Sequence, residues 1–282
     1  MQAAVPPRSR NSDTAVRFVL PVSGAMVTLR EPTGVEDLLL AEHAPEDPRL
    51  ALALAQRLAR GDVAADAAPD WVALCVADID TLVVRLRQML VGDRVVAEMT
   101  CASCDCRVDL SFGLGSYLAH HRPAPRPPRG RGWTSAICAD APGWHAVTAD
   151  GTEAARFRLP ALADQIAVYG VPDAAAALAA RCIRPHDAPA RTRSRVEAAM
   201  AALAPPLAGP LQGQCPECGA PVAARFEARL YCLQELRDRA RFVYDDVDTL
   251  AERYHWSERA ILALPRARRV QYAERARQGL AA

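Results

Sequence analysis

The chain lacks most of the features by which membrane, secreted and nucleic-acid-binding proteins are recognised from sequence. No stretch approaches the ~18 uninterrupted apolar residues that a transmembrane helix needs. Residues 1–13 are polar and contain proline, so they lack the apolar core of a signal peptide. Aromatic residues make up only 5% and the formal net charge is +1, so the basic surface with stacking aromatics of a nucleic-acid-binding protein is not indicated. We therefore expect no membrane partner and consider nucleic acid an unlikely one.

Sequence signatures of common enzymes are absent as well. The chain has no G-x-S-x-G, no H-E-x-x-H and no glycine-rich phosphate loop. Asp245 and Asp246 are neighbours in a helical pattern, and adjacent helical residues diverge, which makes them a poor acid–base pair. His255 stands beside Trp256 at an expected helix junction, where packing or capping is the better interpretation. We expect a protein without catalytic activity or a small-molecule substrate.

The composition is that of a folded protein in a reducing compartment. At 282 residues the chain is expected to form one or two domains. Half of it is hydrophobic (51%) and a quarter charged (24%), which is typical of globular proteins. The nine cysteines are odd in number and several lie in helical patterns, which argues against a disulfide framework. We expect a cytoplasmic protein.

Two C-x-x-C motifs are the strongest signal in the chain. They are Cys101-Ala102-Ser103-Cys104 and Cys215-Pro216-Glu217-Cys218, and strand-like residues flank both of them. Two residues between thiols let both sulfur atoms face one ion, and two such motifs supply the four thiolates of a closed tetrahedral zinc site. The sequence therefore predicts one structural Zn²⁺, bound by Cys101, Cys104, Cys215 and Cys218.

Other interpretations of these cysteines were considered. A disulfide pair would suit a secreted chain, which nothing in the sequence indicates. A thioredoxin-type C-x-x-C opens a helix in a βαβ unit, whereas strand-like residues follow both motifs here. Cys106 adds a spare thiol to the first motif and leaves open whether it replaces Cys104 as a ligand. His120 and His121 are another candidate metal pair, for which surface positions are the simpler interpretation.

The order of the predicted elements occurs twice. A hairpin at 16–30 and another at 145–159 are each followed by helices and then by a C-x-x-C motif. Pro160 and Asp164 stand where Pro32 and Asp37 stood, at offsets of 128 and 127. We therefore predict an α+β fold, mostly helical, in which two hairpin–helix–knuckle halves share one split zinc-ribbon site. The predicted parts are a disordered tail (1–14), a first half (15–118), a Pro/Arg-rich linker (119–143), a second half (144–228) and a C-terminal helical segment (229–282).

Three local expectations complete this prediction. Residues 205–213 are expected to form a loop because they contain proline and glycine. The apolar stripe over 230–251 predicts one long helix. The arginines of the linker could contact phosphate, but they have no regular spacing, so a solvated loop is favoured; they are Arg122, Arg126, Arg129 and Arg131.

Several short motifs together resemble one protein family. They are Val27-Thr28-Leu29-Arg30-Glu31-Pro32-Thr33-Gly34, Asp80-Thr81-Leu82, Cys215-Pro216-Glu217-Cys218-Gly219, Tyr254-His255-Trp256-Ser257-Glu258, Ile261-Leu262-Ala263-Leu264 and Arg268-Arg269-Val270-Gln271-Tyr272. In this order they resemble the baseplate hub assembly chaperones of contractile-tailed phages and their relatives in extracellular contractile injection systems. The chain departs from the family pattern at Asp105, where a knuckle glycine is expected, at Cys106 and in the long linker.

The resemblance implies a non-enzymatic assembly factor whose partners are baseplate or hub proteins, acting in the cytoplasm or also present in the assembled particle. The alternative is a zinc-ribbon protein that binds nucleic acid or has a regulatory role. The segment after Trp256 is too short to bury all of its apolar residues by itself. These residues must therefore pack on the preceding helix or on a partner. The candidate partner-binding residues are Trp256, Ile261, Leu262, Arg268, Arg269 and Tyr272.

Overall fold

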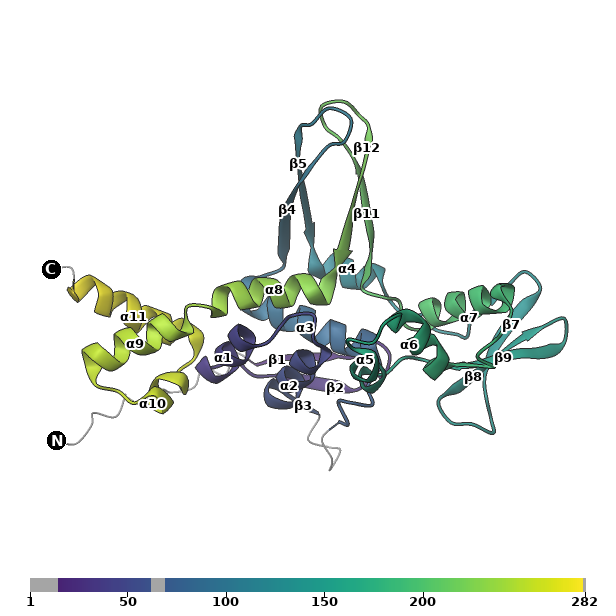
Figure 1. The fold of residues 1–282 in the computed structure, drawn as a ribbon, viewed down its shortest axis with the longest axis horizontal. Coiled ribbons are helices and arrows are strands. Elements are labelled where there is room, and N and C mark those ends of the chain that lie inside the picture. The colour runs from purple at the N-terminus through teal and green to yellow at the C-terminus, as the bar shows by residue number, and fades with distance from the viewer. Residues whose placement is uncertain (1–14, 62–68, 281–282) are drawn as a thin grey trace. The chain divides into compact units, whose positions relative to one another are not determined.

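The computed structural model describes residues 15–61 and 69–280 and has the predicted α+β composition (Figure 1). The tail predicted at 1–14 lies outside the described residues. The chain divides into two compact units, and neither is continuous in sequence. The first unit contains the N-terminal residues up to Phe18 together with Met26–Ala68 and Cys232–Ala282, and the second contains Val19–Ala25 and Pro69–Tyr231.

The first unit combines a small sheet with helices from both ends of the chain. Its elements are β1 (Val16–Val19, ending at the unit boundary), β2 (Met26–Leu29), α1 (Gly34–Glu42), α2 (Pro48–Leu58), β3 (Ala59–Gly61), α9 (Val243–Tyr254), α10 (Glu258–Leu262) and α11 (Arg266–Leu280). The sheet order is β1-β2-β3. Leu250, Ile261, Ala273 and Ala276 form a buried core between the three C-terminal helices. The C-terminal segment is therefore part of a core and not a separate appendage.

A buried charge network joins α1 to the C-terminal helices. Asp37 on α1 is fully buried and accepts hydrogen bonds from Arg266 and Arg269. Arg269, also buried, donates to Asp246 on α9, which accepts from Arg277 as well. Buried charges are tolerated only when they are paired and hydrogen-bonded, and this network meets that condition for both aspartates.

The second unit holds the remaining sheets and both cysteine motifs. Its elements are α3 (Val76–Val91), β4 (Arg94–Thr100), β5 (Arg107–Gly113), α4 (Leu114–His120), β6 (Arg129–Gly130), β7 (Trp133–Ile137), β8 (Trp144–Ala149), β9 (Thr152–Arg158), α5 (Leu162–Val168), α6 (Ala174–Cys182), β10 (Ile183–Arg184), α7 (Ala190–Leu203), β11 (Ala208–Gln214) and β12 (Pro221–Glu227). One sheet has the order β10-β9-β8-β7-β6, and the hairpins β4–β5 and β11–β12 are separate two-stranded sheets.

The segment predicted as a linker, 119–143, contains two of these strands. β6 pairs with β7, and β7 pairs with β8 along five residues from Trp133 to Ile137. Its prolines and arginines hid this pattern, because proline and scattered charge are depleted from strands. The parts of the segment between α4 and β6 and between β7 and β8 remain irregular.

The predicted duplication is visible in the connections. β1-β2-α1-α2-β3 in the first unit has the same order as β8-β9-α5-α6-β10 in the second, and each third strand pairs with the second one. Glu36 at the start of α1 corresponds to Asp164 at the start of α5, 128 residues later (164 − 36). Arg30 donates to Glu36 as Arg158 donates to Asp164. The match between Asp164 and Asp37 expected from the sequence is therefore one residue off, because the equivalent residue is Glu36.

Two further expectations were wrong in detail. Residues 208–214, which lie largely within the predicted loop, form β11 and pair along their whole length with β12. The helix predicted over 230–251 is two helices, α8 (Ala228–Ala240) and α9, and α8 runs from the second unit into the first. None of the helices within the described ranges is long and apolar enough to cross a lipid bilayer.

Candidate metal centre

The two C-x-x-C motifs form the turns of two hairpins that stand side by side in the second unit (Figure 1). The ladder of β4 and β5 ends at Thr100 opposite Arg107, and the ladder of β11 and β12 ends at Gln214 opposite Pro221. Each turn therefore has six residues and begins with the first cysteine of its motif. Figure 1 shows the two turns meeting at the tips of the hairpins.

The two turns have the same hydrogen bonds. In the first, the Cys101 N–H donates to the Cys106 carbonyl, and the Asp105 N–H donates to the Cys101 carbonyl, each at 2.9 Å. In the second, Cys215 and Gly219 take the places of Cys101 and Asp105, and both distances are again 2.9 Å. An offset of 114 residues (215 − 101) relates the two sets.

Both turns need a residue in the left-handed backbone region. Gly219 has φ 71°, as the C-x-x-C-G pattern predicts, and Asp105 has φ 57° at the equivalent position. Aspartate is one of the few non-glycine residues found in this region, because its short polar side chain is compatible with it. The departure of Asp105 from the glycine pattern therefore leaves the turn intact.

The turns bring four sulfur atoms together. The Sγ atoms of Cys101, Cys104, Cys215 and Cys218 all lie within 4.8 Å of one another and could hold a metal ion. Two contacts between the motifs cross over, because Cys101 approaches Cys218 and Cys104 approaches Cys215, each at 3.7 Å. The first cysteine of each motif is buried and the second is exposed. Each hairpin therefore supplies one inner and one outer thiol.

Backbone amides favour the thiolate form of the inner cysteines. The N–H groups of Cys218 and Glu217, together with the Cys106 thiol, lower the pKa of Cys215 to about 6. The N–H groups of Ser103 and Cys104 lower the pKa of Cys101 in the same way. A hydrogen bond to a charged form stabilises that form, and a thiolate is the form that ligates a metal.

Cys106 is a fifth thiol at the edge of this cluster. Its Sγ lies 3.1 Å from the Sγ of Cys215. By the 114-residue offset it corresponds to Ala220, and both side chains pack with Met99 and Val222 around the inner cysteines. Its equivalence to an alanine indicates a packing position, whereas Cys104 occupies the C-x-x-C position equivalent to Cys218.

An aromatic cluster joins the same hairpins at their bases. The rings of Phe112 on β5 and Phe226 on β12 meet edge to face with centroids 5.1 Å apart. Tyr117 of α4 also meets Phe226 edge to face at 5.2 Å, and Tyr231 of α8 lies 5.4 Å from it. The sequence analysis missed this contact. The signal was present, because Phe112 and Phe226 are related by the same 114-residue offset as the cysteines.

The histidines considered as ligands or catalysts lie elsewhere. The His121 ring bonds the Tyr117 carbonyl, and neither it nor His120 belongs to the metal cluster found among the described residues. His255 is exposed and ends α9 with φ 55°. It stands at a helix junction, as expected from the sequence.

The predicted partner-binding residues fall into two groups. Ile261, Leu262 and Arg269 are buried inside the first unit, so they are corrected from surface to core residues. They pack there because α10 and α11 close over α9 and α1. Trp256 and Tyr272 keep partly exposed rings that meet edge to face at 5.4 Å. Arg268, the remaining predicted residue, is also partly exposed.

Comparisons with known proteins do not place the chain in a group. No family model matches it, and neither the curated proteins nor the solved structures contain a match.

Proposed function

We propose that the four-cysteine cluster binds one structural Zn²⁺. The observation that supports this most directly is the spacing of the sulfur atoms. A tetrahedral zinc site with Zn–S bonds of about 2.3 Å has sulfur atoms about 3.8 Å apart. The two crossed contacts between the motifs measure 3.7 Å. Four thiolates are soft ligands that suit Zn²⁺ and not Mg²⁺ or Ca²⁺, which take oxygen ligands.

The role of this zinc is structural in the proposal. Four cysteine ligands complete the tetrahedral shell, which leaves no position for a substrate or a reactive water. The ligands lie on turns separated by more than a hundred residues, so the site cannot exist before both hairpins have formed and met. Zinc binding free energy then contributes directly to the folding of the second unit.

Zinc content and two matched variants test this. The purified protein should carry about one zinc per chain in elemental analysis. Cys218→Ser should lower zinc content, whereas Cys106→Ser should leave it unchanged, because Cys106 occupies the position equivalent to Ala220. A chelator should lower the melting temperature of the wild type. No zinc or two zinc ions per chain, or zinc loss from Cys106→Ser alone, would contradict the assignment.

We further propose that the protein is a non-enzymatic assembly factor for the baseplate hub of a contractile phage tail or a related injection system. The resemblance of its motifs to that chaperone family supports this proposal, and a closed metal site is compatible with it. Baseplate or hub proteins would be the partners, and the cytoplasm the place of action, with the assembled particle as a second location.

Within this proposal, the partly exposed residues of the C-terminal helices contact the partner. They are Trp256, Arg268 and Tyr272, and tryptophan, tyrosine and arginine are enriched at interface hot spots. The unit also exposes Phe242 and Tyr244, at 49% and 53%.

Complementation of a strain that lacks the gene tests the assembly role. Arg268→Glu should reduce the number of intact contractile particles seen by electron microscopy. Glu274→Arg, a charge reversal at an exposed position of the same helix that does not share the face of Arg268 and Tyr272, is the control and should complement normally. Normal particles in the strain without the gene would refute the assembly role. Equal counts from both variants would refute the surface only.

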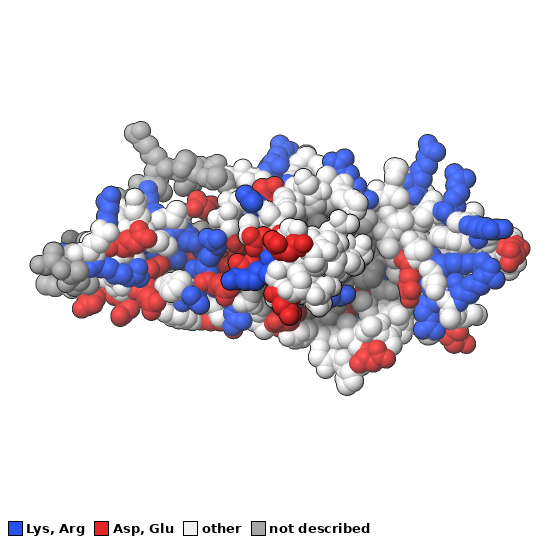
Figure 2. All heavy atoms as spheres, turned by 90° about the horizontal axis from the view of Figure 1, so that it is seen from above, with Lys and Arg blue, Asp and Glu red and all other residues white. Residues whose placement is uncertain are grey.

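One observation favours the alternative of nucleic-acid binding. Figure 2 shows basic side chains gathered at the right of the view, over α7 and the five-stranded sheet of the second unit. The exposed arginines of these elements and their connections are Arg129, Arg131, Arg184, Arg191 and Arg193. Binding to phosphate through such residues weakens steeply with salt. Duplex DNA binding by fluorescence anisotropy at two salt concentrations, lost on Arg191→Ala, would support the alternative over the assembly role.

A further inference from the structure

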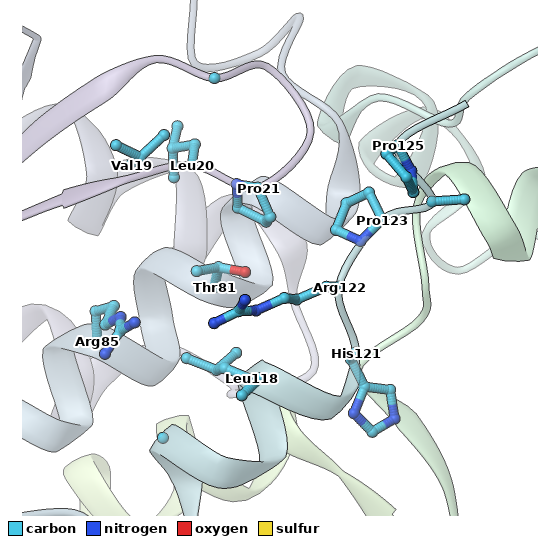
Figure 3. A pocket seen from close by; sticks show the side chains of 14 residues that line it. Val19, Leu20, Pro21, Thr81, Arg85, Leu118, His121, Arg122, Pro123 and Pro125 are labelled. Carbon is cyan, nitrogen blue, oxygen red and sulfur yellow. The ribbon is translucent and has the colours of Figure 1, made fainter. Parts of the chain in front are cut away.

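The second unit contains a pocket that neither the metal site nor the proposed partner surface uses. Its volume is about 580 Å³, within the range of small-molecule sites. Three segments of the unit line it: residues 19–24, the helices α3 and α4, and residues 121–125. Figure 3 shows Arg122 reaching into it between Thr81 and Leu118, with its guanidinium turned toward Arg85.

The charge of this pocket is of one sign. Within the part of the chain that the structure describes, Arg85 and Arg122 are its only charged lining residues, and no aspartate or glutamate lines it. Arg85, on α3, donates a hydrogen bond to the Gln88 side chain at 3.0 Å. Among the described residues, no acidic side chain forms an ion pair with Arg122. The Arg122 guanidinium therefore faces a cavity whose lining carries no carboxylate, which favours an anion beside it.

The rest of the lining is largely apolar. Apolar side chains from all three segments form the walls, and they are Val19, Leu20, Pro21, Leu118, Ala119, Pro123, Ala124 and Pro125. An inorganic anion would leave these walls in contact with water. A ligand that carries a charged head and a short apolar body would cover them, at a gain of about 25 cal/mol for each Å² removed from water.

The walls are held in place without a ligand. The N–H groups of Val22 and Ser23 donate to the two carboxylate oxygens of Asp78 on α3, at 2.8 and 2.9 Å. On the opposite wall, the N–H of Ala124 donates to the Ala202 carbonyl of α7 at 2.7 Å. The prolines of both walls restrict the backbone further. A pocket that is formed in advance does not lose binding free energy to its own ordering.

We propose that this pocket binds a small amphiphilic anion, a carboxylate or phosphate head on a short apolar body. Arg122 binds the head from the solvent side, where its exposed position leaves the entrance open, and Arg85 adds positive charge from α3. The apolar body lies against the proline and leucine side chains. This site is independent of the four-cysteine cluster and of the assembly role.

Octanoate and octyl phosphate are the probes for the two head groups. Zinc-loaded, ¹⁵N-labelled protein is titrated with each, and the backbone amides are followed by NMR. The signals of Gly24 and Gly115, which line the pocket, should shift with saturation. Octanol, which has the same apolar body without charge, should bind at least about tenfold more weakly, because a charge-assisted hydrogen bond is lost.

Two arginine variants provide the matched comparison. Arg122→Gln should weaken binding of the charged probe at least about tenfold. Arg126→Gln removes an exposed arginine four residues away that does not line the pocket, and it should bind like the wild type. Circular dichroism and zinc content confirm that both variants are folded. Equal binding by wild type and Arg122→Gln, equal binding of octanol, or shifts confined to other parts of the chain would each overturn the proposal. Failure of both charged probes at millimolar concentration would overturn it as well.

Discussion

Replacement of Asp37 by asparagine should destabilise the first unit far more than an ordinary surface substitution. The asparagine would keep the shape of the side chain and one acceptor oxygen but would lose the negative charge. Asp37 is fully buried and Arg269 is 1% exposed, so their charges have little access to water. Arg266, 13% exposed, has Asp37 as its ion-pair partner. The substitution therefore leaves buried positive charge without its counter-ion.

The size of the effect follows from the network. Breaking a buried ion pair by removing one partner costs about 3–5 kcal/mol. Arg269 retains Asp246 at 3.2 Å, which compensates part of its charge, so the lower end of this range applies. About 3 kcal/mol corresponds to a change of more than about a hundredfold in the unfolding equilibrium. A domain of ordinary stability would lose a large fraction of its total free energy of unfolding.

Native-state hydrogen exchange measured by mass spectrometry separates the two units. In Asp37→Asn, the opening free energy of peptides from α1, α9 and α11 should fall by about 3 kcal/mol. Peptides from β4, β5, β11 and β12 should keep their protection. Asp248→Asn, which removes an exposed carboxylate from α9, is the control and should change protection by less than about 0.5 kcal/mol. A loss below about 1 kcal/mol in Asp37→Asn would refute the conclusion that the buried network stabilises the unit.

Two further predictions concern pH and truncation. The Arg158 side chain, which donates to the Asp164 carboxylate, holds the pKa of that carboxyl well below its usual range despite burial. A depressed folded-state pKa stabilises the folded chain above the unfolded pKa of about 3.9, and this contribution is lost as pH falls. The stability difference between wild type and Asp164→Asn in urea should therefore be full at pH 7 and shrink below about pH 4; a difference that is constant with pH would contradict this. Deletion of residues 257–282 removes Ile261, Ala273 and Ala276 from the core. The deletion should abolish hydrogen-exchange protection in α1 and α9, while zinc content stays at one per chain. A truncated protein with full protection would show that the segment is dispensable.

The geometry of the four-cysteine cluster was predictable because it depends on short-range chemistry. A C-x-x-C between strand-like residues dictates a tight turn with two thiols on one side, and this holds for both motifs. The meeting of the two turns was inferred from the need for four ligands, and the sulfur contacts agree with it. The equivalence of Cys106 to Ala220 was also within reach of the sequence, because it follows from the 114-residue offset between the motifs, and the registers of both hairpins agree with it.

The missed strands have two different physical causes. β11 consists of Ala-Gly-Pro-Leu-Gln-Gly-Gln, a sequence with little intrinsic strand preference, and it is extended because β12 provides a partner for every residue. β7 is Trp-Thr-Ser-Ala-Ile, which favours a strand, and it was missed because prolines and arginines surround it and β6. Tertiary pairing overrides local preference in β11, and a single sequence carries no direct signal for it.

Three of the predicted partner-binding residues, Ile261, Leu262 and Arg269, are core residues for a different reason, which lies in the interleaved order of the chain. Each β-β-α-α-β repeat docks against the start of a helix that is distant in sequence. In the first unit the Gly34 N–H donates to the Leu264 carbonyl just before α11, and in the second the Leu162 N–H donates to the Leu74 carbonyl just before α3. If the chain is divided into two consecutive halves, the C-terminal helices have no core to pack against. Their apolar residues then resemble a binding surface for another protein. The repeat at the other end of the chain already covers part of that surface, because α1 contacts α9, α10 and α11. An apolar terminal segment therefore indicates a separate partner protein only when packing against the opposite end of the same chain has been excluded.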